Sequence, residues 1–113
     1  MHEMAITRSV LSIALDEAKK HNARAVRSVE LLIGEYSGAI PACVEEYFNI
    51  LSRGTIAEHA RLVIKRQPAR VSCADCGYDG ETKPFYALCP ACGGEHIRIV
   101  SGTQFCVNSL EVE

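Results

Sequence analysis

Four of the six cysteines form two C-x2-C pairs in the second half of this 113-residue chain. Cys73 and Cys76 make the first pair, and Cys89 and Cys92 make the second, with twelve residues between the pairs. Two such pairs can hold one ion tetrahedrally, because each pair closes a tight chelate ring. The spacing therefore predicts a structural Zn²⁺ site with these four cysteines as its ligands.

Glycine follows each pair, at Gly77 and Gly93. Glycine adopts positive φ without steric cost, so turns at these positions leave amide N–H groups free to point at the thiolates. The segment between the pairs suits a short hairpin. The apolar residues of this module are mainly Phe85, Tyr86 and Leu88, so we expect zinc to supply its folding energy, on the order of 10–16 kcal/mol in zinc-finger peptides.

Other interpretations of the cysteines compete with zinc. Disulfides are typical of secreted proteins, a thioredoxin-like redox pair needs a βαβ context that is missing here, and an iron–sulfur centre also uses four cysteines. A ribbon that reads nucleic acid needs a basic surface. Residues 70–100 carry three basic and four acidic side chains, and four thiolates around Zn²⁺ add a further charge of about −2. Paired cysteines favour zinc, and the charge argues against nucleic acid.

The first residues, Met1, His2 and Glu3, offer a different kind of metal chemistry. The terminal amine, the amide nitrogen of His2 and its imidazole Nδ1 can close two fused chelate rings. A planar nitrogen-rich set of this kind suits Ni(II) or Cu(II) rather than Zn(II). A helix N-terminus repels cations, and the Glu3 carboxylate would offset that repulsion. On its own this motif is weak, since a histidine at a chain end is usually idle.

Composition restricts the class of protein. Apolar residues make up 48% of the chain and the net charge is −2, which supports a folded core and gives no general attraction to nucleic acid or anionic lipid. No stretch approaches the roughly 20 apolar residues of a membrane span, and the N-terminus does not resemble a signal peptide. We therefore expect a cytoplasmic protein without a membrane or nucleic-acid partner.

Hydrophobic periodicity predicts an α+β fold in which two helices accompany a three-stranded sheet. The expected elements are a helix over 4–21, a strand over 25–35, a helix from Pro41 to about Gly54, and strands over 60–66 and 105–113. A two-stranded sheet is marginal alone, so the last strand should pair back into the first domain. The predicted domains are 1–69 plus 102–113, a nickel-binding α/β domain, and 70–101, an inserted zinc ribbon.

The remaining cysteines and histidines fit less specific roles. Cys43 and Cys106 stand in apolar contexts that are typical of small buried side chains. His21 can cap the end of the first helix, and His59 is expected to be solvated. His96 follows the second cysteine pair and could approach the nickel end if the two modules fold together.

Several stretches together resemble the HypA family of nickel metallochaperones for hydrogenase maturation. They are "MHEMAITRSV", "VELLIGEYSGAIP", "GTIAEHARLVI", "ALCPACGG" and "GTQFCVNSLEVE", which span the whole chain. The resemblance implies a small nickel-binding domain and a zinc-ribbon domain. It implies that His2 is the essential nickel ligand, that Met1 and the backbone nitrogens lie beside it, and that Glu3 supports or completes the site.

The resemblance also implies partners. They are the GTPase HypB, the large subunit of [NiFe] hydrogenase and, in some organisms, urease maturation proteins. Ni²⁺ would be transferable cargo and Zn²⁺ a structural cofactor, and no nucleophile–base pair points to an enzyme. The alternative hypothesis is a zinc-ribbon adaptor that binds protein or RNA without transferring a metal.

Overall fold

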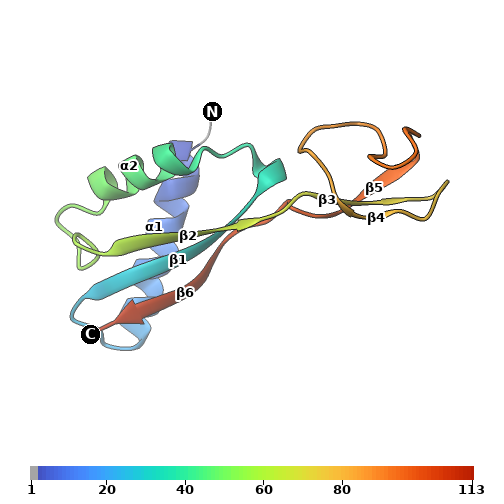
Figure 1. Cartoon of the computed structure of the whole chain (residues 1–113). Helices are drawn as coiled ribbons and strands as arrows, with labels where there is room; N and C mark the ends of the chain where they lie inside the picture. The colour runs from blue at the N-terminus through green and yellow to red at the C-terminus, as the bar shows by residue number, and fades with distance from the viewer. Residues whose placement is uncertain (1–2) are drawn as a thin grey trace. The chain divides into compact units, whose positions relative to one another are not determined.

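The computed structural model describes residues 3–113, with Met1 and His2 outside the described residues (Figure 1). Its elements are α1 (Glu3–Lys20), β1 (Val26–Gly34), the 3-10 helix η1 (Glu35–Ser37), α2 (Pro41–Leu51), β2 (Arg61–Gln67), β3 (Arg70–Cys73), β4 (Asp79–Glu81), β5 (Ile97–Ser101) and β6 (Phe105–Val112). The α+β class and all five elements expected from periodicity are confirmed, each within a few residues of its predicted ends.

Two compact units make up the chain. Unit 1 contains residues up to 32, 39–65 and 106–113, and unit 2 contains residues 33–38 and 66–105. The predicted limits of independently folding domains, 70–101 for the ribbon and 1–69 plus 102–113 for the rest, stay a prediction. Each unit has its own three-stranded sheet, ordered β2-β1-β6 in the first case and β4-β3-β5 in the second.

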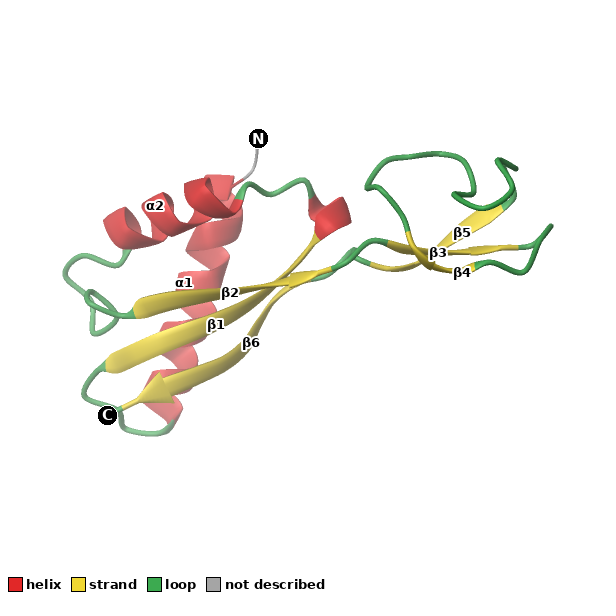
Figure 2. Cartoon of the chain, in the orientation of Figure 1, coloured by secondary structure: helices red, strands yellow, loops and turns green. Residues whose placement is uncertain are grey.

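Helix α1 buries a stripe at helical spacing that includes Val10, Ala14 and Ala18. It ends where Asn22 takes a left-handed conformation, φ 53°, and the Ala23 N–H donates to the Ala18 carbonyl over 3.0 Å. Asparagine tolerates this conformation better than most residues, which explains why the chain turns here. Figure 2 shows α1 crossing behind the first sheet and packing against α2.

Strand β1 is the central strand of the first sheet, and its alternating residues Val29, Leu31 and Ile33 are buried. The end of β6 pairs with the start of β1, since the Arg24 N–H donates to the Glu113 carbonyl over 2.8 Å. The C-terminal strand therefore returns to the first sheet as predicted, and residues 68–104 are inserted between its strands β2 and β6.

Unit 2 contains a three-stranded sheet where the sequence predicted only a short hairpin. Both β4 and β5 pair antiparallel with β3, with Cys73 opposite Ile97 and Ser72 opposite Asp79. The expected hairpin lies not between the cysteine pairs but across the first pair, because β4 returns along β3. Strands of three to five residues carry too few alternations for periodicity to reveal them.

A dense junction in unit 2 holds the segment 33–38 against residues 66–105. The Gly34 N–H donates to the Gln104 carbonyl over 2.6 Å and the Tyr36 N–H donates to the Gly102 carbonyl over 2.7 Å. A Cβ atom on Gly34 would lie 2.1 Å from the Gly102 carbonyl oxygen, so only glycine fits this approach. The junction fixes Tyr36 within unit 2.

Candidate metal centres

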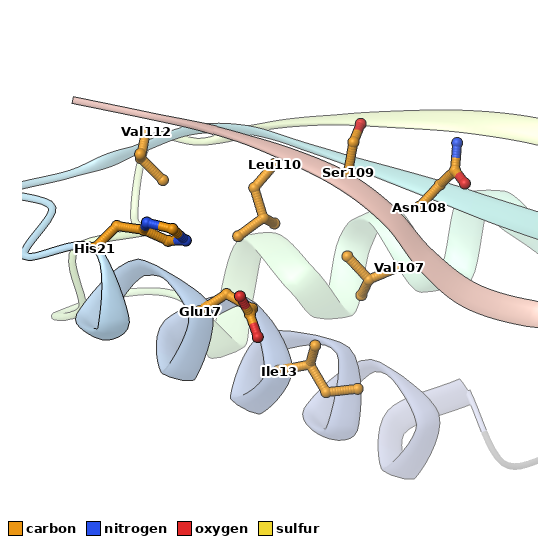
Figure 3. Close-up of a pocket in the computed structure, with 8 residues that line it drawn as sticks. All are labelled: Ile13, Glu17, His21, Val107, Asn108, Ser109, Leu110 and Val112. Carbon is orange, nitrogen blue, oxygen red and sulfur yellow. The ribbon is translucent and has the colours of Figure 1, made fainter.

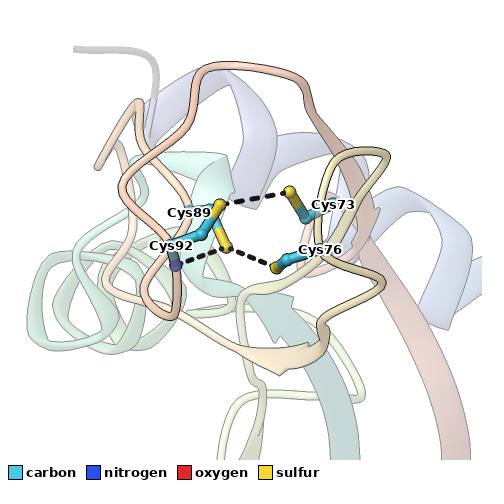
Figure 4. Close-up of side chains that lie close together, drawn as sticks. All are labelled: Cys73, Cys76, Cys89 and Cys92. Carbon is cyan, nitrogen blue, oxygen red and sulfur yellow. Dashed lines mark hydrogen bonds between the residues drawn. The ribbon is translucent and has the colours of Figure 1, made fainter.

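The four paired cysteines meet in unit 2, and their sulfur atoms all lie within 4.8 Å of one another. Figure 4 shows the side chains converging from two loops. The Sγ atoms of Cys73 and Cys92 are 3.8 Å apart, and those of Cys76 and Cys89 are 3.6 Å apart. A Zn–S bond of about 2.3 Å in a tetrahedron places sulfurs about 3.8 Å apart. The donor set therefore fits a tetrahedral Zn²⁺ ion.

The local backbone explains this convergence. Gly77 and Gly93 adopt φ of 76° and 74°, as the sequence predicted. In the second turn the amide groups of Ala91 and Cys92 donate to the Cys89 sulfur, each over 3.4 Å. N–H groups directed at sulfur stabilise a thiolate, so the turn favours the charged form that binds a metal.

Backbone hydrogen bonds and crowding shift the pKa values of three thiols in the cluster. Hydrogen bonds from the backbone amides of Cys92 and then Ala91, together with neighbouring thiols, lower the pKa of Cys89 to about 7. The Tyr78 amide lowers the pKa of Cys76, but burial and the neighbouring cysteines outweigh it and raise the pKa to about 12. The Gly94 amide and the Cys76 sulfur lower the pKa of Cys92, but burial and the sulfurs of Cys89 and Cys73 outweigh them and raise it. The shifted pKa values favour the thiolate at Cys89 and the thiol at Cys76 and Cys92.

Zinc binding should therefore release protons. The metal-free protein favours the thiol form of Cys76 and Cys92 at neutral pH, because the pKa of each is raised from the ordinary value of a thiol. Since zinc binds thiolates, we expect at least two protons released per ion and weaker binding as pH falls. Calorimetric titration with Zn²⁺ in buffers of different ionisation enthalpy measures this number. Release of fewer than two protons would contradict a four-thiolate site.

His96 lies beside the first cysteine turn. Its Nδ1 is 2.8 Å from the Asp75 Oδ2, and both side chains are exposed. This contact occupies one ring nitrogen within unit 2. The approach of His96 to the N-terminus stays a prediction.

The predicted nickel ligands Met1 and His2 lie outside the described residues, whereas Glu3 is the first residue of α1. Its side chain is buried, and its Oε2 accepts the backbone N–H of Ile40 over 3.3 Å. Ile40 is the N-cap of α2 and has no side-chain cap, and Pro41 follows it. The Glu3 carboxylate thus accepts the N–H of the N-cap residue itself, as a capping-box glutamate does, and places a negative charge at the start of α2. The sequence motif predicts Glu3 as part of the nickel site, and this contact between residues 37 positions apart leaves no local pattern that would reveal it.

Glu3→Ala should destabilise unit 1. It removes a buried, charged acceptor at a helix N-terminus, a loss of about 1–2 kcal/mol in the free energy of unfolding. Urea denaturation followed by circular dichroism measures the change as a lower midpoint at unchanged slope. Glu17→Ala, which breaks an exposed contact with Lys20, is the matched control and should change stability by less than about 0.5 kcal/mol. If the two substitutions lowered the free energy of unfolding equally, the stabilising contact between Glu3 and the start of α2 would be contradicted.

Other surface features of the described residues are poor metal sites. Unit 1 has a pocket of about 520 Å³. In Figure 3, Ile13 and Glu17 of α1, together with His21 just after the helix, face Leu110 and other residues of β6. It holds one imidazole and one carboxylate. Within residues 3–113, the four cysteines are the one group of three or more histidine, cysteine or carboxylate side chains close enough to share an ion.

The two unpaired cysteines differ from the expectation that both are buried. Cys43 is half-buried in α2, but Cys106 is exposed, so for Cys106 the prediction was wrong. Cys106 lies on β6, an edge strand of the first sheet, where alternate residues face away from the core. No helix among residues 3–113 is long and apolar enough to cross a membrane.

Comparison with known proteins agrees with the geometry. A family model described as hydrogenase/urease nickel incorporation, metallochaperone, matches residues 1–112. The hydrogenase maturation factors HypA of Geobacter metallireducens and Aquifex aeolicus are 43% and 38% identical to this chain, covering all of it and 100% and 98% of their own lengths.

A solved structure supports the fold. The solution structure of the Ni metallochaperone HypA from Helicobacter pylori superimposes with a TM-score of 0.68 at 24% identity, covering 99% of this chain and 97% of that one. At that identity the likeness speaks for the fold alone. The match of the family model and the identity with two full-length relatives go further: the chain belongs to the HypA family, whose members are metallochaperones and maturation factors for nickel incorporation rather than enzymes.

Proposed function

We propose that this protein binds Ni²⁺ at its N-terminus and delivers it for [NiFe] hydrogenase maturation, while Zn²⁺ at Cys73, Cys76, Cys89 and Cys92 holds unit 2 in shape. The observation that carries the proposal is the family match over residues 1–112, which spans both the Met1–His2–Glu3 start and the four-cysteine cluster. Nickel ligands would be the Met1 amine, the backbone nitrogens and the His2 imidazole.

The two sites have donor sets that suit different roles. Four sulfurs in tetrahedral spacing, two of them buried at Cys73 and Cys89, suit a retained structural ion. Nitrogen ligands at a chain end suit a planar Ni²⁺ complex that an acceptor can approach and dismantle stepwise. Nickel would be exchanged and zinc kept.

The Glu3 contact supports a positioning role in this site. Because its carboxylate accepts the Ile40 N–H, Glu3 ties the start of α1 to the start of α2. Its charge also offsets the positive end of α1 for an incoming cation. Glu3 would thus support the nickel site chiefly by position and charge.

The proposed partners are the GTPase HypB, the large subunit of [NiFe] hydrogenase and, as a further acceptor, urease maturation proteins, in the cytoplasm. The competing hypothesis is a zinc-ribbon adaptor without a transferable metal. Nickel titration distinguishes the two, because the adaptor has no reason to bind nickel at the chain end.

Acetylating the Met1 amine tests the proposed ligand geometry. The acetyl group removes the amine as a ligand and opens one of the two fused rings, so we expect Ni²⁺ affinity to fall by at least about tenfold while zinc stays at one ion per chain. Nickel K-edge absorption should change at the same time from a planar nitrogen-rich spectrum to a six-coordinate one. An acetylated protein that binds nickel with the same affinity and spectrum contradicts the proposal.

A further inference from the structure

Unit 2 carries an open cavity of about 550 Å³ that the four cysteines do not line. Eight residues line it, and we call it the aromatic groove: Tyr36, Phe85, Tyr86, Ala87, Glu95, Ile97, Ile99 and Thr103. The groove brings together η1, the loop between the cysteine pairs and β5. Neither metal site proposed above uses it.

Packing within unit 2 preorganises this groove. The rings of Tyr36 and Phe85 meet edge to face, with centroids 5.6 Å apart and planes at 84°. Tyr36 is held by its N–H bond to the Gly102 carbonyl. Ile97 and Ile99 alternate on β5, so their side chains share one face of the strand. Rings and aliphatic side chains thus gather on one surface of unit 2.

Its apolar residues are unusually exposed. Phe85 is 71% exposed and Ile99 49% exposed. Phe85 also holds a left-handed backbone at φ 65°, a conformation that is costly for a bulky side chain. A strained, exposed phenylalanine contributes little to folding of the single chain. Contiguous exposed apolar surface of this kind marks interaction sites.

Charge and strand geometry indicate the occupant. Glu95 is the one charged residue among the described residues that line the groove, and its carboxylate forms no ion pair within residues 3–113. Aromatic faces also attract cations. The bordering strand β5 is an edge strand, which offers unpaired backbone groups to an extended chain.

We propose that the aromatic groove binds an extended segment of a partner protein, with apolar side chains against Phe85 and Ile99 and a lysine or arginine against Glu95. The segment adds to the edge of β5 as a further strand. This function is separate from nickel binding and does not rest on it.

Selection from a random 12-residue peptide display library on the full-length, zinc-loaded protein tests the proposal. Enriched peptides should carry apolar residues and at least one lysine or arginine. Once synthesised, they should bind Phe85→Ala at least tenfold more weakly than the parent protein. Ile56→Ala, which alters an exposed apolar residue in unit 1, should bind them unchanged.

The charge contact has its own test. Selection on Glu95→Lys should enrich acidic peptides in place of basic ones, with zinc still at one ion per chain in every variant.

Failure to enrich any peptide, or equal binding by Phe85→Ala, overturns the proposal. The proposal is also overturned if the parent protein sediments as a dimer and the Phe85→Ala variant sediments as a monomer. The occupant of the groove would then be a second copy of this chain. The His2→Ala variant should bind the peptides normally. Failure of the peptide proposal can therefore be distinguished from failure of the nickel proposal.

Discussion

Cys73→Ser should remove zinc from the protein and unfold unit 2 while leaving unit 1 folded. Cys73 is buried, 3% exposed, and ends β3, the central strand of the second sheet. Structural zinc supplies about 10–16 kcal/mol of folding energy in small metal-binding modules, which matches or exceeds the whole stability of a typical domain, about 5–15 kcal/mol. Unit 2 has few other buried apolar side chains, so loss of the ion leaves too little to hold it.

Metal analysis and NMR measure the two parts of this result. Zinc should fall from one ion per chain to nearly none, and amide signals of β3, β4 and β5 should collapse to unfolded positions. Signals of α1 and α2 should keep their dispersion. Cys106→Ser is the matched control, since Cys106 is exposed and outside the cluster, and it should keep both zinc and spectrum. If the zinc-free variant kept dispersed amide signals for unit 2, zinc would be dispensable for its folding.

His2→Ala should abolish specific nickel binding and leave zinc in place. The imidazole would close one of the two fused rings, so its loss removes a ligand atom and breaks a chelate. Changes to groups that only support a ligand cost 10–100-fold in metal affinity, so we expect a loss of at least about 100-fold here. Calorimetric titration of the untagged, zinc-loaded protein with Ni²⁺ measures it.

Other histidines provide the controls for nickel. His21→Ala and His59→Ala alter exposed imidazoles outside both proposed sites, and both variants should bind nickel like the parent. His96→Ala separately tests whether that imidazole joins the nickel site. If His2→Ala binds nickel as tightly as the parent, nickel delivery from the N-terminus is wrong even though the chain belongs to the HypA family.

Local spacing determined much of this protein. The helices follow from stripes such as Val10, Ala14 and Ala18, and the stop at Asn22 follows from its tolerance of a left-handed backbone. The four-cysteine cluster is visible because each C-x2-C pair brings its two sulfurs together within one turn, and Gly77 and Gly93 permit that turn. Such features depend on residues a few positions apart, so the sequence alone predicts them.

Features that join distant segments needed the tertiary structure. Glu3 meets the start of α2 only because α1 and α2 pack together, and the exposure of Cys106 depends on β6 taking the edge of its sheet. The second sheet pairs residues 70–73 with 97–101, and its strands are too short to show a period. The aromatic groove likewise combines Tyr36 with Phe85 through a junction that only Gly34 and Gly102 allow. Long-range packing decides these contacts, because side-chain patterning records which face is buried but not which segment covers it.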